Sequence, residues 1–184
     1  MKYAQNLRRS GLSAVRQLLA ALFAAAAAVA LPQLIHLISG AAGHGTMLGE
    51  MLLPMHLPVI AVGLVAGPLA GVVSGLAAPI VSYLLCGMPL AVMVPFIAIE
   101  LCTYGLLAGL LKSSGMPVLC KVLLVQVGGR AVRAAAILLS VYGLHHAVPT
   151  VSVIWTSIAT GALGIALQWI LIPLLVKGMQ RLEK

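Results

Sequence analysis

The sequence predicts an all-α membrane protein, a compact six-transmembrane-helix bundle with both ends in the cytoplasm (N-in/C-in). Its composition is 62% hydrophobic and 8% charged, against roughly 45–50% and about 25% in soluble domains. Lys, Arg, Asp and Glu are missing from 17–49, 51–99 and 134–176. At ~20 residues per span, these stretches hold about one, two and one and a half spans.

Three other classes of protein fit the sequence less well. A soluble fold with so little polar surface would expose large apolar patches. A membrane β-barrel would show alternating apolar and polar residues in ~10-residue segments, whereas this chain has solid apolar blocks. The net charge of +8 does not indicate nucleic-acid binding, because the basic residues cluster at span ends, as in membrane proteins.

We expect a single integral membrane domain covering 1–184, with a basic cytoplasmic lead-in over 1–16. The six spans are expected at about 17–38, 50–66, 69–86, 91–111, 118–142 and 152–176. Glycine and proline residues mark the breaks between them. The basic N-terminus and the apolar run that follows also resemble a signal peptide. That run continues past Ala30 to Ile38, which favours a first membrane span.

The basic residues give the topology. Nine of them fall in segments that are cytoplasmic when the N-terminus is inside: Lys2, Arg8, Arg9, Arg16, Lys112, Lys121, Lys177, Arg181 and Lys184. The outer loops carry no Lys or Arg, and the two remaining arginines, Arg130 and Arg133, lie within the fifth span. The positive-inside rule therefore predicts a multi-pass protein with both termini in the cytoplasm.

Small residues recur at four-residue spacing on several predicted helices. They form the runs Ala20, Ala24 and Ala28; Gly63, Gly67, Gly71 and Gly75; and Gly105 and Gly109. Such ridges let helix backbones approach closely in lipid. They serve either packing within the bundle or docking of another membrane subunit, and the alanine run is the best candidate for docking.

Charged residues inside a membrane are costly, so Glu100, Arg130 and Arg133 indicate a function or a structural pair. At ~1.5 Å per residue, Glu100 and Arg133 both lie roughly 13 Å below the outer surface, which predicts contact between them. Tyr104 lies one turn below Glu100, and Gln126 shares a helix face with both arginines. The alternative is a Glu–Arg pair that only locks two helices. The second arginine favours a carboxylate-bearing substrate, since arginine binds carboxylates in fork geometry.

Catalytic and cofactor motifs are missing from the sequence. It contains no Asp, no phosphate-binding glycine loop ending in Lys-Ser/Thr and no His-Glu-x-x-His helix. The three cysteines have no paired spacing and the histidines match no fixed ligand pattern. We therefore expect no enzyme activity, no metal and no cofactor in this chain, and any ATP-driven work would come from a partner. Trp155 is a further candidate, for interfacial anchoring or ligand stacking.

Several motifs, taken in order, resemble one family of membrane proteins. They are Met55-His56-Leu57-Pro58-Val59, Gly67-Pro68-Leu69-Ala70-Gly71, Leu84-Leu85-Cys86-Gly87-Met88-Pro89, Glu100-Leu101-Cys102-Thr103-Tyr104-Gly105, Gly129-Arg130, Gly164-Ile165-Ala166-Leu167-Gln168 and Ile172-Pro173. Over about residues 15–177 the chain is similar to the substrate-specific (S) components of energy-coupling factor (ECF) vitamin transporters.

This resemblance implies a subunit of an ABC-type importer in the bacterial cell membrane. It would bind a water-soluble vitamin or related precursor from outside. It would then dock, through Ala20, Ala24 and Ala28, on a coupling membrane subunit with two ATPases that use ATP. The implied cavity residues are His56, Glu100, Tyr104, Arg130, Arg133 and Trp155, beside Gln126 from the helix face. Lys2 stands where the nickel and cobalt members carry histidine, which argues against metal cargo. A pantothenate-like acid suits the extra arginine, and folate, riboflavin and queuosine precursors remain open.

Two other functions remain as alternatives. A self-sufficient secondary carrier or small channel would show inverted repeats and proton-coupling carboxylates, and the sequence has a single intramembrane Glu and no clear repeat. A membrane-embedded enzyme or assembly factor is disfavoured by the missing catalytic set.

Overall fold

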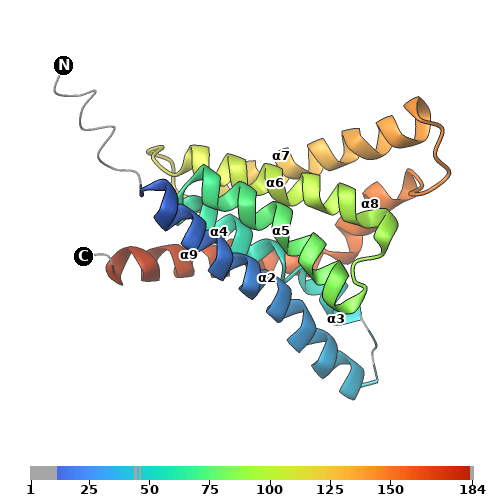
Figure 1. Ribbon diagram of the computed structural model, residues 1–184, viewed down its shortest axis with the longest axis horizontal. Coiled ribbons are helices and arrows are strands. Elements are labelled where there is room, and N and C mark those ends of the chain that lie inside the picture. Colours follow the sequence, from blue (N-terminus) through green and yellow to red (C-terminus); the bar gives the residue numbers. More distant parts are fainter. Residues whose placement is uncertain (1–11, 44, 46, 183–184) are drawn as a thin grey trace.

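The computed structural model describes residues 12–43, 45 and 47–182, with side chains through 179, and every regular element in these ranges is helical (Figure 1). Part of the predicted lead-in, with Lys2, Arg8 and Arg9, lies outside the described residues. Within them, six helical segments are long and apolar enough to cross a membrane: Ala14–Ala41, Met47–Ala66, Pro68–Cys86, Ala91–Leu111, Val118–Gly143 and Ala162–Met179. The prediction of an all-α chain with six candidate spans is confirmed at this level.

The elements follow one another along the chain without strands in the described part. They are α2 (Ala14–Ala41), α3 (Met47–Leu52), α4 (His56–Ala66), α5 (Pro68–Cys86), a 3-10 turn η1 (Ala91–Met93), α6 (Val94–Leu111), α7 (Val118–Leu138), a π-helical turn η2 (Leu139–Gly143), α8 (Ser152–Thr160) and α9 (Ala162–Leu182). Ser13 caps the start of α2, where its side chain accepts a hydrogen bond from the backbone N–H of Arg16.

The second predicted span is divided into two helices. The helix α3 ends at Leu52, and Leu53 has a φ of 48°, in the left-handed region. Pro54 follows, and a residue that precedes proline is disfavoured in the helical conformation. The span predicted at 50–66 is therefore α3 and α4, joined through a break at Leu53–Met55.

The sixth predicted span, 152–176, was placed too early. The chain turns at Gly161, which separates the short α8 from α9, and α9 alone is long enough to span. A Cβ at Gly161 would lie 2.6 Å from Leu53 Cδ1, so glycine lets the α3–α4 break approach this turn. Hydropathy is uniform across the junction and does not signal a break.

Glycine brings the central helices together. Gly71 on α5 and Gly105 on α6 contact each other backbone to backbone, with no room for a Cβ at either position. A Cβ at Gly75 would lie 2.5 Å from the Leu101 carbonyl oxygen, and one at Gly63 on α4 would lie 2.8 Å from Ala108 Cβ. The predicted glycine ridges are thus used for packing within the bundle, as expected for helices in lipid.

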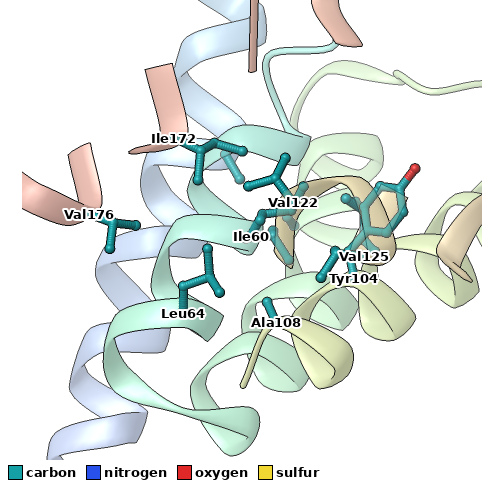
Figure 2. Packing of buried hydrophobic residues seen from close by; sticks show 12 residues of the cluster. Ile60, Leu64, Tyr104, Ala108, Val122, Val125, Ile172 and Val176 are labelled. Atoms are coloured by element: carbon teal, nitrogen blue, oxygen red, sulfur yellow. The ribbon is translucent and has the colours of Figure 1, made fainter. Parts of the chain in front are cut away.

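The main hydrophobic cluster fills the space between α4, α6, α7 and α9. Figure 2 shows its members, among them Ile60, Tyr104, Val122, Val125 and Ile172, which are all buried. The helix α2 packs against α4 and α5, with Ala28 in this cluster and Ala21 in a second one with Ala66 and Ala70.

The two ends of the bundle differ (Figure 1). At what we call the terminal end lie the start of α2, the end of α9 and the loop 112–117. At the opposite end, the cavity end, α2 and α7 diverge, and α3 and α8 lie between them. Arg16, Lys112, Lys121 and Lys177 belong to terminal-end segments. Assignment of the terminal end to the cytoplasm remains a prediction from the basic residues.

Candidate functional site

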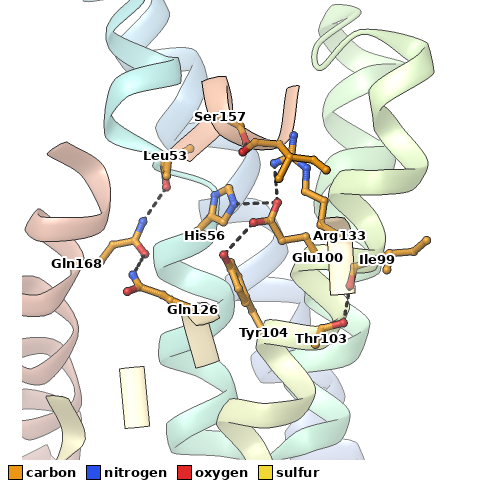
Figure 3. Close-up of polar contacts among 11 residues, drawn as sticks. Leu53, His56, Ile99, Glu100, Thr103, Tyr104, Gln126, Arg133, Ser157 and Gln168 are labelled. Atoms are coloured by element: carbon orange, nitrogen blue, oxygen red, sulfur yellow. Dashed lines mark hydrogen bonds and ion pairs between the residues drawn. The ribbon is translucent and has the colours of Figure 1, made fainter. Parts of the chain in front are cut away.

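Glu100 is the centre of a buried polar cluster in the middle of the bundle (Figure 3). Its carboxylate is fully buried on α6. Oε2 accepts a hydrogen bond of 2.8 Å from Arg133 Nη1 on α7, and Oε1 accepts one of 2.8 Å from Tyr104 Oη, one helical turn along α6. The contact predicted from the equal depths of Glu100 and Arg133 is confirmed.

His56 completes this cluster from the first turn of α4. Its Nε2 lies 3.8 Å from Glu100 Oε2, an ion pair when the ring is protonated. The His56 side chain is 9% exposed, and neither ring nitrogen has a hydrogen-bond partner within the described part of the chain. Its centroid lies 5.4 Å from that of the Tyr104 ring, and the Tyr104 ring in turn lies against Gly129, where a Cβ would clash.

A second polar chain links α7 and α9 to the α3–α4 break. Gln126 Nε2 donates to Gln168 Oε1 at 3.0 Å, and Gln168 Nε2 donates to the Leu53 carbonyl oxygen at 3.2 Å. Trp169 Nε1 donates to Gln126 Oε1 at 2.7 Å. The side-chain hydrogen bonds of Gln126 are therefore made with α9. Gln126 takes no part in the Glu100 cluster, although both arginines follow it on α7.

Arg130 lines a small pocket that it shares with Arg133. With Arg133, Ser157 and apolar residues it lines a void of about 10 Å³ between α7 and α8, room for about one water molecule. The Nε atoms of Arg130 and Arg133 are both buried and have no hydrogen-bond partner among the described residues. Two guanidinium groups thus lie near one buried carboxylate.

A cavity of about 540 Å³ occupies the cavity end of the bundle. Its polar lining comes from Gln33, His36, Glu50, His56, Ser82, Arg133, Thr150, Thr156, Ser157 and Thr160. Its apolar lining includes Pro32, Leu53, Met55, Met88, Leu90, Val92, Met93, Ile97, Val148 and Val153. This volume lies in the range of about 300–1,000 Å³ found for small-molecule sites, and the mixed lining is typical of them.

Two of the predicted site residues reach this cavity, namely His56 and Arg133. Glu100 and Tyr104 are buried behind them and hold them in place. Gln126 and Arg130 do not line the cavity, and Trp155 on α8 is 71% exposed and does not line it either. Of the predicted residues, the cavity therefore brings together His56 and Arg133, whose side of the cavity we call the floor, and a role of any of these residues in binding stays a prediction.

The alanine run of the first helix is used inside the molecule. Ala28 is fully buried and Ala24 is 8% exposed, while Ala20 packs against the cluster that includes Ala66 and Ala70. The large exposed residues of α2 beside this run are Leu22 and Phe23, and Ala26 and Ala30 are exposed as well. Ala24 and Ala28 are thus used for packing within the bundle, one of the two predicted roles, and docking of a partner through the alanine run stays a prediction.

Most of the cavity lining was missed by sequence reasoning. Gln33, His36 and Glu50 come from segments that looked like ordinary span ends, and Met88 and Met93 from a turn. One signal was present, because Thr156, Ser157 and Thr160 interrupt an apolar run. Three of the hydroxyl groups in the cavity wall come from this short stretch of α8.

Comparison of the chain with protein-family models, with curated proteins and with solved structures gives no match. These comparisons therefore lend no support to the resemblance to ECF substrate-specific components, which remains a prediction. Among the described residues, no three His, Cys, Asp or Glu side chains lie close enough to hold a metal ion.

Proposed function

We propose that this chain binds a small water-soluble solute in the cavity and serves as the substrate-specific subunit of an ECF-type importer for a vitamin or related precursor. The observation that carries the binding function is the cavity of about 540 Å³, lined by residues from the first five candidate spans and from the loops and short helix α8 at the cavity end. Cavities of this size, apolar with a few convergent polar groups, are the usual ligand sites of proteins.

The packing below the cavity floor favours binding over conduction. Tyr104, Leu101, Ile60 and Val125 are buried directly behind His56 and Glu100 and form part of the main hydrophobic cluster. A channel needs a continuous path lined with polar groups or water. A site that opens at one end and is closed at the other fits a receptor.

Delivery of the solute requires a partner in this proposal. The sequence contains no phosphate-binding loop, so ATP would be used by two ATPase subunits that act through a coupling membrane subunit. Basic residues at the terminal end favour its location in the cytoplasm, where ATPases act. The cavity end would then face outward in the bacterial cell membrane.

A proton-coupled secondary carrier is the second candidate function. The buried Glu100, with His56 3.8 Å away, is the observation that favours it, because intramembrane carboxylates and histidines carry protons in many transporters. This function would need no ATPase partner.

The test is purification of the tagged full-length chain from membranes of its own host, together with uptake measurements. The importer predicts recovery of a second membrane protein and two ATPases, and uptake that stops on ATP depletion while the proton gradient is kept. A six-span membrane protein with the same tag is the control. Uptake that survives ATP depletion but stops with a protonophore contradicts the importer and supports the carrier.

A further inference from the structure

We infer that the solute is an amphipathic anion, whose carboxylate or comparable oxyanion lies on the cavity floor against Arg133 and His56. This inference rests on the proposed binding function and names the chemical class of the ligand. The sequence alone favours a carboxylate-bearing substrate but does not say where the carboxylate would bind. The cavity lined by Arg133 and His56 is the binding position that we infer.

The charges at the floor do not balance. Glu100 on α6 is the acidic residue buried there. Arg133 on α7 forms an ion pair with it, and Arg130, one turn earlier on α7, lines a small pocket together with Arg133 and contributes a second positive charge nearby. One positive charge is therefore in excess in the described part of this region, before any protonation of His56. Buried charges are usually paired or compensated by a ligand.

Arg133 and His56, the two residues of the floor, carry polar nitrogens that lack hydrogen-bond partners in the described ranges. Arg133 uses Nη1 for Glu100, and its Nε has no hydrogen-bond partner in the described ranges. His56 lines the cavity and is 7% exposed, and both of its ring nitrogens are buried without a hydrogen bond to any described residue. Glu100 does not line the cavity, so a ligand at the floor meets a guanidinium and an imidazole rather than a carboxylate.

The remaining walls define the rest of the ligand. Met55, Met93 and Ile97 give an apolar wall, and Thr156, Ser157 and Thr160 on α8 give hydroxyl groups. Methionine-lined surfaces accept varied apolar shapes. The acidic residue of the lining, Glu50, is exposed on α3. An anionic group at the floor and an apolar body above it match this distribution.

The two arginines also differ in their position relative to the cavity. Arg133 lines the cavity and Arg130 does not. Guanidinium groups bind carboxylates through two parallel N–H donors, so loss of Arg133 removes the direct contact. Glu100 acts as a positioning residue, because it holds Nη1 of Arg133 without reaching the cavity.

The inference is tested by ligand-induced thermal stabilisation of the purified full chain in lipid nanodiscs. The probes are acids paired with their primary amides: hexanoate with hexanamide, benzoate with benzamide, and 3-phenylpropanoate with 3-phenylpropanamide. We expect at least one acid to stabilise at about tenfold lower concentration than its amide. Arg16→Gln, which removes an exposed arginine at the terminal end, is the control and keeps this preference.

Because Arg133→Gln also leaves Glu100 without its guanidinium, the double variant Glu100→Gln/Arg133→Gln is measured beside it. Both variants are expected to lose the acid preference. Equal effects of acids and amides, an acid preference retained in the double variant, or no stabilisation by any probe overturns the inference. A neutral or cationic solute bound to the purified chain would also overturn it, while leaving the proposed binding function intact.

Discussion

At the scale of single residues, one buried carboxylate organises the polar cluster in the middle of the bundle. Glu100 accepts hydrogen bonds from Arg133 and Tyr104 and lies near His56. A buried ion pair contributes little net stability when both partners are compared with apolar residues, because both charges lose their hydration. Removal of one partner is different, since it leaves the other charge buried and uncompensated.

The Glu100–Arg133 pair therefore predicts strong non-additivity. Glu100→Gln and Arg133→Gln should each lower the free energy of unfolding by about 3–5 kcal/mol. The double variant should be more stable than the sum of the two losses implies. Denaturant unfolding in detergent measures all four proteins, and additive losses would show that the two side chains are not coupled.

Tyr104→Phe tests the hydroxyl group separately from the ring. Phenylalanine keeps the ring contact with Gly129 and removes the donor to Glu100, and hydrogen bonds to charged groups contribute about 1.5–3 kcal/mol. We expect a loss of that size in the free energy of unfolding. Tyr142→Phe is the matched control, because Tyr142 is 69% exposed. Equal stability of both variants would exclude a contribution from the Tyr104 hydroxyl group.

At the scale of helices, close backbone approach sets the arrangement of the bundle. Gly71 and Gly105 meet at the crossing of α5 and α6, and Gly109 lies against Pro68. The neighbours are backbone atoms that cannot rotate away, unlike flexible side chains. Any added Cβ must push the helices apart.

Gly105→Ala should therefore destabilise the protein although alanine is the better helix former. Overpacking costs about 1–3 kcal/mol, more than the gain of ~1 kcal/mol in helix propensity. Gly178→Ala on α9 is the control, because a Cβ there meets nothing within 4 Å, and it should be neutral or stabilising. Thermal unfolding in detergent compares the two, and a stabilised Gly105→Ala would refute the α5–α6 crossing.

The helix breaks mark the limit of prediction at this scale. The run from Met47 to Ala66 and the run from Ser152 to Val176 each read as one apolar segment, because hydropathy reports composition and not direction. Pro54 is a local signal for the first break, but the breaks at Leu53 and Gly161 also contact each other, and Gln168 donates a hydrogen bond to the Leu53 carbonyl. Such contacts between distant segments are not visible in a local pattern.

At the scale of the whole molecule, charge placement predicts which end of the bundle is inside. Ser113 lies in the terminal-end loop and Ala147 in the cavity-end loop, and both are exposed. In a cysteine-free background, Ala147→Cys should react with a membrane-impermeant maleimide added to intact cells. Ser113→Cys should react after the cells are opened. The reverse pattern would place the cavity in the cytoplasm and contradict import.

The same scale shows how far the sequence predicted the site. Depth counting correctly brought Glu100 and Arg133 together, since it needs only span ends and helical rise. Depth counting did not predict that Arg133 lines the cavity while Arg130 and Trp155 do not, because cavity lining depends on where α8 packs. The cavity itself is assembled from α2, the α3–α4 break and α8. Neither the volume of the cavity nor the position of its opening can be predicted from any one segment of the sequence.

The central claim is that this cavity holds a small solute, and native mass spectrometry tests it most directly. The parent chain, purified in mild detergent, should carry one small molecule. A cavity-filling variant, Thr156→Trp/Thr160→Trp, should carry none, because both positions line the cavity. The control Ser152→Trp/Ala159→Trp places the same side chains elsewhere on α8 and should keep the molecule. A solute retained by the cavity-filling variant, or none in the parent, would contradict the account.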